Sequence, residues 1–509
     1  MNGDLNKILV ANRGEIAVRV MRACREMGIP SVAVYSDCDR DARHVREADQ
    51  AIHIGPSPAA QSYLRIDGII DAARRTGADA IHPGYGFLAE NAAFAQACED
   101  ARLTFIGPSA QAIRLMGSKT AARGAAIRAG VPVVPGTEKP FAASASDAEI
   151  VEAAARVGYP LLVKAVAGGG GKGMRSVERP EDLLPAVRTA RSEAGSAFGD
   201  TAVYFERRIR TPRHIEIQLL GDHHGTVIPF VERECSIQRR HQKVVEESPS
   251  LAVTPELRRR IAGAAEAVAK SVGYHNAGTI ECLLDEDGSF YFLEMNTRLQ
   301  VEHPVTEMVT STDLVHWQIR IARGEKLDID PERALTPRGH AIECRIYAED
   351  PDLGFMPSPG LIRGLRPASG PGIRDDGGVG AGYTVPVFYD SMIAKLVSWG
   401  TSRDEAIARM SRALREYQVL GIKTTIPFFL WLMQQRSYRH GEYDTTYLDR
   451  LLAERNGESF NELTKADEDL AAIAAAMDAY LRAGAGGAQT GPANTALWKQ
   501  TARREALRG

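Results

Sequence analysis

The chain has 509 residues, with 62 lysines and arginines against 65 aspartates and glutamates, so its formal net charge is −3. A charge so near zero disfavours a nucleic-acid-binding protein, which normally carries a basic excess. At about 150 residues per domain, the length suggests about three domains. The hydrophobic share of 44% and the charged share of 25% are those of an ordinary soluble globular protein.

The six cysteines are scattered, and no two form a C-x-x-C pair, which disfavours a zinc ribbon or a thioredoxin-like site. Sparse cysteines of this kind are typical of a reduced cytoplasmic protein. The first expected strand begins at residue 7, with no secretion signal before it, and the sequence has no apolar run of about 20 residues. These features predict a cytoplasmic protein without a membrane partner.

The first hundred or so residues show alternating strand and helix patterns. An apolar run at residues 8–11 is followed by a helical spacing of Ile16, Val20 and Cys24, and residues 31–35 form a second apolar run. This β-α-β order predicts a parallel sheet. The turn after the first run is Asn-Arg-Gly-Glu and lacks the G-x-G-x-x-G pattern, which disfavours a dinucleotide site.

A glycine-rich segment at residues 168–173 lies between two expected strands, at residues 163–166 and 174–177. A P-loop would need a Ser or Thr after Lys172 and a helix directly after the loop, but Gly173 stands at that position. The segment is therefore predicted to be a flexible hairpin whose backbone amides can approach phosphate oxygens. A mobile surface loop without a ligand is the alternative.

Two strands joined by an acidic turn are expected between Thr279 and Asn296. The expected register places Glu281 opposite Phe292 and one diagonal step from Glu294, with Asn296 on the same face. Two carboxylates and an amide oxygen on one face suit Mg²⁺ or Mn²⁺ that bridges nucleotide phosphates. A solvated charged face is the alternative, and the aromatic second strand disfavours it.

The next segment, residues 296–304, places a cation, an amide, a carboxylate and an imidazole within a few positions. Packing alone explains such density poorly, because each buried charge needs a partner. Arg298 beside Glu302 can bind a small anion and remove a proton from it, whereas a structural Arg–Glu pair is the alternative. Two basic clusters, at residues 206–214 and 233–243, are interpreted as local anion sites rather than as solvated faces.

Beyond residue 335, several β-like runs begin with residues 339–346, and a helix is expected at residues 403–417. After about residue 455 the composition changes. Thr464 and Asp467 resemble a capping box, and they open an Ala-rich helix with an apolar stripe of Leu470, Ile473, Met477 and Tyr480. A linker at residues 484–492 and a basic amphipathic stretch at residues 497–508 complete the chain.

Four long motifs resemble the biotin carboxylase family of ATP-grasp enzymes: residues 10–17, residues 82–91, the glycine loop, and residues 294–307. The similarity extends from about residue 5 to about residue 450. It implies an α/β and α+β multidomain ATP-grasp fold with an N-terminal Rossmann-like domain. The implied parts are an N-terminal α/β domain (1–118), an ATP-grasp domain (119–335) with a glycine-rich lid subdomain (about 137–207), a C-terminal biotin carboxylase domain (336–450), and a helical extension, linker and basic tail (451–509).

The resemblance also implies roles for individual residues. Glu302 would be the base that removes the proton of bicarbonate, and Arg345 would stabilise the enolate-like oxyanion of biotin, which Tyr85 touches. Metal ions would bind to Glu281, Glu294 and Asn296, and bicarbonate to Lys243, Arg298, Gln300, Val301 and Glu302. ATP would bind to Lys119, Lys164, Gly168, Gly169, Gly170, Gly171, Gly173, Met174, Glu206, Arg207, Ile209, His214, Gln238, His241, Glu281 and Glu294.

The implied activity is ATP-dependent carboxylation of biotin by bicarbonate through carboxyphosphate, which gives ADP and phosphate. The implied cofactors are ATP and two Mg²⁺ or Mn²⁺ ions. Biotin would be a substrate on a separate biotin carboxyl carrier protein, because the sequence has no Met-Lys dipeptide to carry it. Carboxyltransferase subunits are the other expected partners, together with a second copy of the chain, for which Arg19, Glu26 and Arg374 match dimer positions.

The sequence leaves alternatives for the parent complex, for the activity and for the role of the tail. The parent complex is expected to be an acetyl-CoA or other acyl-CoA carboxylase, and a split pyruvate carboxylase is the main alternative. Another ATP-grasp ligase, such as a purine-pathway carboxylase or half of a carbamoyl-phosphate synthetase, fits the long match and Arg345 less well. A catalytically dead subunit would lack a lysine, a metal ligand or the base, and none is lost here. The tail is either a poorly ordered terminus or a docking element in which Trp498 anchors on a partner.

Overall fold

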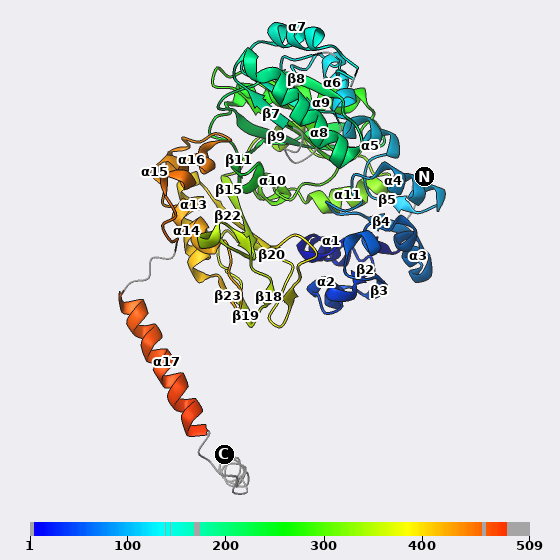
Figure 1. Cartoon of the computed structure of the whole chain (residues 1–509). Helices are drawn as coiled ribbons and strands as arrows, with labels where there is room; N and C mark the ends of the chain where they lie inside the picture. The colour runs from blue at the N-terminus through cyan, green and yellow to red at the C-terminus, as the bar shows by residue number, and fades with distance from the viewer. Residues whose placement is uncertain (1–4, 138, 143, 167–173, 461–464, 486–509) are drawn as a thin grey trace. The chain divides into compact units, whose positions relative to one another are not determined.

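The structure is a computed structural model that describes residues 5–137, 139–142, 144–166, 174–460 and 465–485 (Figure 1). The chain divides into two compact units, Met1–Glu458 and Ser459–Gly509. All described sheets belong to the first unit, and the second contains one described helix. Among the described residues, no helix has both the length and the apolar character needed to cross a membrane.

The N-terminal part of the first unit is a five-stranded sheet with strand order β3-β2-β1-β4-β5, and every neighbouring pair is parallel, as the β-α-β order predicts. Ile8 and Val10 enter one hydrophobic cluster and Leu9 another, because side chains alternate across a strand and helices cover both faces. The strands are β1 (Ile8–Val10), β2 (Ser31–Ser36), β3 (Gln50–Gly55), β4 (Ala80–His82) and β5 (Thr104–Phe105), and the helices are α1 (Gly14–Glu26), α2 (Arg43–Glu47), α3 (Ile66–Thr76), α4 (Ala92–Asp100) and α5 (Ala110–Gly117).

A nine-stranded sheet forms the centre of the unit, with strand order β14-β13-β9-β11-β12-β15-β22-β20 and β10 paired with β9. All its pairs are antiparallel. Because β12 pairs with β15, one sheet continues from the middle of the chain into its C-terminal part. Its strands are β9 (Arg213–Gly221), β10 (Val227–Pro229), β11 (Arg233–Arg239), β12 (Gln242–Ser248), β13 (Asn276–Leu284), β14 (Phe290–Asn296), β15 (His340–Tyr347), β20 (Ile373–Gly377) and β22 (Met392–Gly400).

Five helices accompany the middle part of this sheet. In α9, Thr254 accepts a hydrogen bond from the Leu257 amide and Pro255 occupies the first turn, a combination that favours a helix start. The buried face of α9, including Ile261 and Ala265, packs in one hydrophobic cluster with strands β9, β13 and β14. The five are α6 (Lys119–Arg128), α9 (Pro255–Ser271), α10 (His303–Thr310), α11 (Leu314–Ala322) and α12 (Pro331–Ala334).

A three-stranded antiparallel sheet with order β7-β6-β8 forms a separate lobe, at the top of Figure 1, together with α7 (Asp147–Val157) and α8 (Leu183–Phe198). The strands are β6 (Leu161–Ala165), β7 (Met174–Val177) and β8 (Val203–Arg207). The two strands predicted on either side of the glycine segment are therefore confirmed, and they pair antiparallel. Gly168, Gly169, Gly170, Gly171 and Gly173 lie outside the described residues.

The C-terminal part of the first unit adds short hairpins and helices around β15, β20 and β22. The strand expected at residues 339–346 and the helix expected at residues 403–417 are both present. The further elements are β16 (Glu349–Asp350), β17 (Met356–Pro357), β18 (Gly360–Leu361), β19 (Gly364–Arg366), β21 (Thr384–Val385), β23 (Gln418–Leu420), α13 (Arg403–Glu416), α14 (Ile426–Leu432), α15 (Arg436–His440) and α16 (Tyr447–Glu454).

The second unit contains helix α17 (Lys465–Ala485). Its predicted apolar residues, Leu470, Ile473, Met477 and Tyr480, are 57–78% exposed. Thr464 of the expected capping box, the linker after Ala485 and Trp498 lie outside the described residues. The Ala-rich helix predicted from the sequence is thus present, and its apolar stripe faces solvent.

Candidate active site

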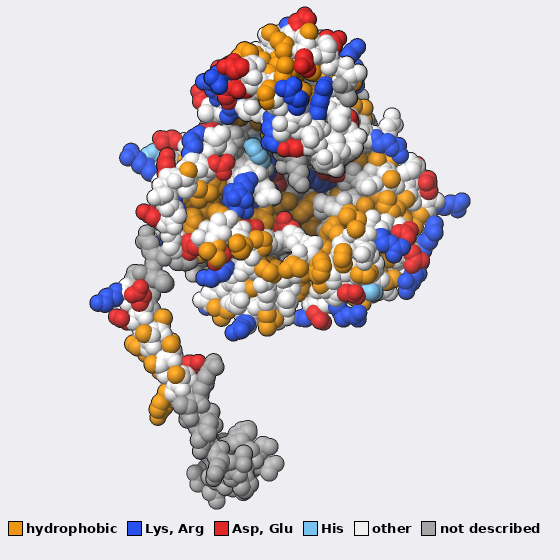
Figure 2. Space-filling model, in the orientation of Figure 1, with side chains coloured by type: hydrophobic (Ala, Val, Ile, Leu, Met, Phe, Trp, Pro, Cys, Tyr) orange, Lys and Arg blue, Asp and Glu red, His pale blue; other side chains and the backbone are white. Residues whose placement is uncertain are grey.

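A cavity of about 550 Å³ lies between the three-stranded sheet and the central sheet, and Figure 2 shows the molecule hollowed in this region. It gathers residues that lie far apart in the sequence, from Lys119 on α6 to Arg345 on β15. The predicted residues that line it are Lys119, Lys164, Met174, Glu206, Arg207, Ile209, His214, Gln238, His241, Lys243, Glu281, Glu294, Asn296, Arg298, Gln300, Val301 and Arg345. The structure therefore brings nearly all the described candidates to one place.

The pairing of β13 with β14 differs from the expected register. Leu284 pairs with Phe290, and a register shift between Glu281 and Cys282 places Glu281 directly opposite Glu294. The expectation that Glu281 faces Phe292 was wrong, because the connecting turn is one residue longer and β14 carries an extra residue at an irregularity of the ladder. The correction brings the two candidate metal-binding carboxylates closer together than predicted.

The pKa values of these two facing carboxyl groups are shifted in opposite directions. Burial raises the pKa of Glu294, and the charge of Glu281 raises it further. Burial would also raise the pKa of Glu281, but Lys243 and His214 lower it well below its ordinary value. Glu281 Oε1 accepts a hydrogen bond of 2.9 Å from Asn296 Nδ2. A divalent cation would relieve the repulsion between the carboxylates, so this oxygen-rich set fits Mg²⁺ or Mn²⁺.

Two lysines lie near Glu294 at the other side of the cavity. Lys119 is in the first turn of α6, and Lys164 on β6 pairs with Glu206 on β8. Burial lowers the pKa of Lys119, Lys164 lowers it further, and Glu294 opposes the shift. Two clustered ammonium groups in the wall of one cavity form a natural site for a polyphosphate.

The deepest charge cluster surrounds Glu302, which has no exposed surface. Lys243 Nζ donates to Glu302 Oε1 at 2.7 Å, to Glu281 Oε1 at 2.9 Å and to Glu216 Oε2 at 2.6 Å. Arg345 Nη2 donates to Glu302 Oε2 at 3.0 Å. Burial alone would raise the pKa of Glu302, but the charges of Lys243, Arg345 and Arg233 lower it well below its ordinary value. Glu302 is therefore ionised, the state in which a carboxylate can accept a proton.

Arg298 is fixed by neutral and acidic partners around the cavity. Its Nε donates to Glu90 Oε2 at 2.9 Å, and its Nη atoms donate to Gln300 Oε1 at 3.1 Å and to Asn296 Oδ1 at 3.0 Å. Gln300 Nε2 in turn donates to Glu281 Oε1 at 3.0 Å. Among these partners of Arg298, Glu90 alone is charged. The fixed guanidinium can therefore also bind a small anion.

A second cavity, of about 560 Å³, contains Tyr85. It shares three lining residues with the first: Arg298, Val301 and Arg345. The hydroxyl of Tyr85 is buried and has no hydrogen-bond partner within the described part of the chain, and Lys395 Nζ lies 5.8 Å from the centre of its ring. The two cavities thus meet at a common wall directly next to buried Glu302.

Several members of the site carry no sequence signal that singles them out, Glu90, Glu216 and Glu246 among them. Arg233 belongs to a cluster interpreted as an anion site, and that interpretation was wrong for it. It is fully buried, pairs with Glu216 and donates to Gln218, Thr279 and Thr306. Other arginines of the two basic clusters are also neutralised within the chain, Arg213 by Glu234 and Arg239 by Glu349.

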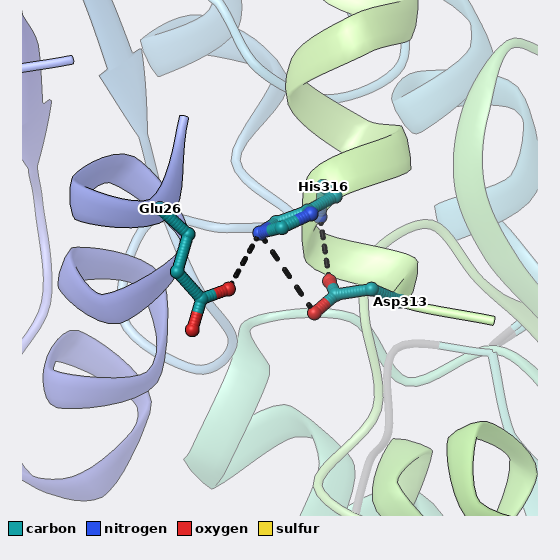
Figure 3. A group of neighbouring side chains, drawn as sticks. All are labelled: Glu26, Asp313 and His316. Atoms are coloured by element: carbon teal, nitrogen blue, oxygen red, sulfur yellow. Dashed lines mark hydrogen bonds and ion pairs between the residues drawn. The ribbon is translucent and has the colours of Figure 1, made fainter. Parts of the chain in front are cut away.

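A separate group of titratable side chains lies between α1 and α11 (Figure 3). His316 Nε2 is 3.0 Å from Glu26 Oε2 and 4.0 Å from Asp313 Oδ2. Asp313 already has a cation, because Arg19 Nη2 lies 2.8 Å from its Oδ1. Arg19 and Arg374 both form ion pairs with the carboxylate of Glu307. The group is an ion-paired cluster, and none of its members lines either cavity.

Comparison with known proteins accounts for this arrangement. Residues 4–113 match the family "Biotin carboxylase, N-terminal domain", residues 118–330 match "Carbamoyl-phosphate synthase L chain, ATP binding domain", and residues 343–450 match "Biotin carboxylase C-terminal domain". Biotin carboxylase 1 of Bacillus subtilis is 52% identical over 446 residues, 87% of this chain and 98% of that protein. The chain belongs to the biotin carboxylase family.

Other relatives of this biotin carboxylase support the same assignment. A pyruvate carboxylase subunit of Methanothermobacter thermautotrophicus is 50% identical over 490 residues, 94% of this chain and 99% of that protein. The solved biotin carboxylase of Campylobacter jejuni has a TM-score of 0.84 at 47% identity and covers 88% of this chain and 99% of its own. Like its family, the chain has the three-part ATP-grasp fold and is an ATP-dependent carboxylating ligase.

Proposed function

We propose that this biotin carboxylase binds ATP in the first cavity and carboxylates biotin that reaches the second cavity on a separate carrier protein. The observation that carries the proposal is the wall of Arg298, Val301 and Arg345, which both cavities share above the buried carboxylate of Glu302. An intermediate made on one side can be used on the other without crossing bulk water.

The roles follow from charge and contact. Arg298, Gln300 and Lys243 hold bicarbonate, and Glu302 takes its proton. A bicarbonate oxygen then bonds to the γ-phosphorus while the bond to the ADP oxygen breaks, which gives carboxyphosphate. Cleavage of the carbon–oxygen bond releases phosphate and CO₂, the phosphate takes the N1′ proton of biotin, and this nitrogen then bonds to the carbon of CO₂. Arg345 stabilises the negative charge that develops on the biotin oxygen.

Lys119 and Lys164 neutralise the phosphates, and Glu281, Glu294 and Asn296 hold the divalent metal. When bound, the metal supplies further charge neutralisation on the phosphate oxygens. This donor set fits because Glu294 lies opposite Glu281 with too little positive charge between them. A related solved structure supports it: the biotin carboxylase domain of the Hydrogenobacter thermophilus 2-oxoglutarate carboxylase, 47% identical to this chain, is a complex with MgADP and bicarbonate.

The proposed partners are a biotin carboxyl carrier protein and carboxyltransferase subunits, with a second copy of the chain as in the Hydrogenobacter domain dimer. An acyl-CoA carboxylase is the expected parent complex. A split pyruvate carboxylase is the second candidate, favoured by the 490-residue alignment to the Methanothermobacter pyruvate carboxylase subunit, against 446 residues for Biotin carboxylase 1. Purification with native partners, followed by ¹⁴C-bicarbonate fixation with acetyl-CoA or pyruvate, tells the two apart.

We also assign the tail to partner docking. The four predicted apolar residues of α17 are exposed along a helix outside the catalytic unit, and such residues bind partner surfaces. A chain truncated after Glu458, which lacks α17 and everything beyond it, should lose capture of the carrier and carboxyltransferase chains while it keeps carboxylation of free biotin. Unchanged complex formation would refute docking through α17 and the segment beyond it.

The carboxyphosphate step has a direct test. Bicarbonate labelled with ¹⁸O should transfer one label into the phosphate released from ATP, because the attacking oxygen stays on phosphorus when the carbon–oxygen bond breaks. Glu302→Gln should abolish the transfer. Phosphate released without label during biotin-dependent turnover would show that water, and not bicarbonate, attacks ATP.

A further inference from the structure

Two glutamates lie directly behind Arg345 in the central sheet. Glu246 on β12 and Glu343 on β15 are cross-strand partners in an antiparallel pair, and both are fully buried. Glu343 and Arg345 are two residues apart on β15, so they project from the same face. Arg345 Nε donates to Glu246 Oε1 at 2.6 Å. The carboxylates and the guanidinium form one cluster inside the protein.

The hydrogen bonds of this cluster leave three carboxylate oxygens unmatched. Oε2 of Glu246 and both oxygens of Glu343 are buried and have no hydrogen-bond partner among the residues that the structure describes. Directly opposite residues of antiparallel strands have Cβ atoms about 4.5–5.5 Å apart, so the two carboxyl groups are neighbours. Two ionised carboxylates at this spacing would repel and lack donors. A single proton between them supplies the missing donor.

The charged surroundings do not remove this conflict. Glu343 faces Lys395 on β22, Arg345 on its own strand and Glu302 before α10, and Glu246 also faces Lys243. Lys395 is engaged elsewhere, since its Nζ donates to Val301 O at 2.9 Å and pairs with Glu15 at 3.1 Å.

The thiol of Cys235 and the phenol of Tyr347 also lie near Glu246, and an apolar set lies beside Glu343. Helix α10 contributes Val305 and Val309 to a hydrophobic cluster with Ala341 and Val397 of the neighbouring strands. Burial, the largest influence, raises the pKa of Glu343 well above its ordinary value and that of Glu246 to about 7. The cluster thus favours a protonated carboxyl over a second buried anion.

We propose that Glu246 and Glu343 share one proton and act together as positioning residues for Arg345. Glu246 remains the anion that holds Arg345 Nε, and the protonated Glu343 donates to the free oxygen of Glu246. Loss of the proton adds a second negative charge behind Arg345, which draws the guanidinium away from the cavity that contains Tyr85. The link to biotin turnover rests on the proposed function of Arg345, whereas the shared proton stands on the cluster itself.

Infrared difference spectroscopy on the full chain tests the shared proton. Near pH 7 the wild-type protein should show a carbonyl-stretch band of the shared carboxyl that is missing from Glu343→Gln, in addition to the contribution of other buried acids such as Glu15, whose pKa burial raises to about 7. The matched control is Glu247→Gln, because Glu247 is the next residue on β12 and its carboxylate is paired with Arg403 and His340. That control should keep the band. Persistence of the band in Glu343→Gln overturns the proposal.

Steady-state kinetics tests the positioning. Gln can donate to Glu246 as the protonated acid does, so Glu343→Gln should keep kcat within about threefold and lose the decline at alkaline pH that deprotonation of the pair causes. Glu343→Leu cannot donate and should lower kcat/KM for biotin by about 10- to 100-fold. A purely structural role would lower stability in both variants and leave the alkaline limb in place, which contradicts the proposal.

The shared proton and the role of Arg345 can each be refuted without the other. Arg345→Gln with wild-type KM for biotin and wild-type kcat would overturn the proposed function of Arg345, whatever the infrared band shows. An unchanged acid band in Glu343→Gln would overturn the shared proton, even if Arg345→Gln is inactive.

Discussion

Glu302 and Lys243 are joined by a hydrogen bond of 2.7 Å inside the protein, with Glu302 fully buried and the Lys243 side chain 13% exposed. A carboxylate would normally be costly at such a place. Here Lys243, together with Arg345, keeps it ionised, so the proposed base is charged before bicarbonate arrives. Through Lys243, the pair connects Glu281, a proposed metal ligand, to the segment that we propose binds bicarbonate.

Glu302→Gln should lower biotin carboxylation by at least about 10²- to 10⁴-fold, the range ascribed to a general base. Gln keeps the shape of the side chain but cannot accept the proton. ATP binding, measured by equilibrium dialysis, should change little, because the predicted nucleotide contacts of Lys119 and Lys164 are intact. Near-normal turnover in this variant would contradict the assignment of Glu302 as the base.

Lys243→Gln should raise the pKa of Glu302, because Lys243 is the first of the charges that offset burial. The acid limb of the pH–rate profile should therefore move to higher pH. Three carboxylates also lose a shared cation, and the free energy of unfolding should fall by about 3–5 kcal/mol. The matched control is Lys270→Gln, which breaks an exposed ion pair with Glu266 on α9 and should lower the free energy of unfolding by less than about 1 kcal/mol. Denaturant titration measures both changes.

Arg233→Gln should act on stability rather than on substrate binding. The guanidinium is fully buried on Glu216, away from the surface of both cavities. Its removal breaks this buried ion pair, leaves Lys243 as the remaining cation on Glu216, and should cost about 3–5 kcal/mol in denaturant unfolding. If folded Arg233→Gln shows an unchanged unfolding free energy but a raised KM for bicarbonate, Arg233 is an anion-binding residue after all.

Glu247 predicts a pH dependence of stability. Burial would raise its pKa, but Arg403 and His340 lower it well below the ordinary 4.5. Because the folded value lies below the unfolded one, the stabilisation is fully present above about pH 4.5 and is lost as the pH falls further. The free energy of unfolding should therefore decline in acid, and Glu247→Gln should show a smaller decline. Equal slopes for the two proteins would contradict the ion pairs.

Local sequence pattern predicts the elements well where contacts are near in the chain. The parallel order of β1 and β2, the strands that flank the glycine segment and the hairpin of β13 and β14 all follow from apolar periodicity and turn residues. The register within that hairpin does not, because a ladder irregularity beside Glu281 leaves no periodic signal. One extra residue changed which carboxylates face each other.

The charge partners of the site show a second limit. Glu216 and Glu246 lie on interior strands whose neighbours come from distant parts of the chain, and pairing of β12 with β15 joins residues about 100 positions apart. In the sequence, Arg233 cannot be told apart from an arginine on the protein surface. Only the assembled sheet shows that it is an internal counterion, so the interpretation of the basic clusters as anion sites was too broad.

The central claim is that this chain carboxylates biotin with bicarbonate and ATP, and ADP release with and without free biotin tests it most directly. With ATP, Mg²⁺ and bicarbonate present, free biotin should accelerate ADP formation severalfold, and Arg345→Gln should lose most of this acceleration. Bicarbonate-dependent ATP hydrolysis that biotin leaves unchanged would contradict the account and favour another ATP-grasp ligase.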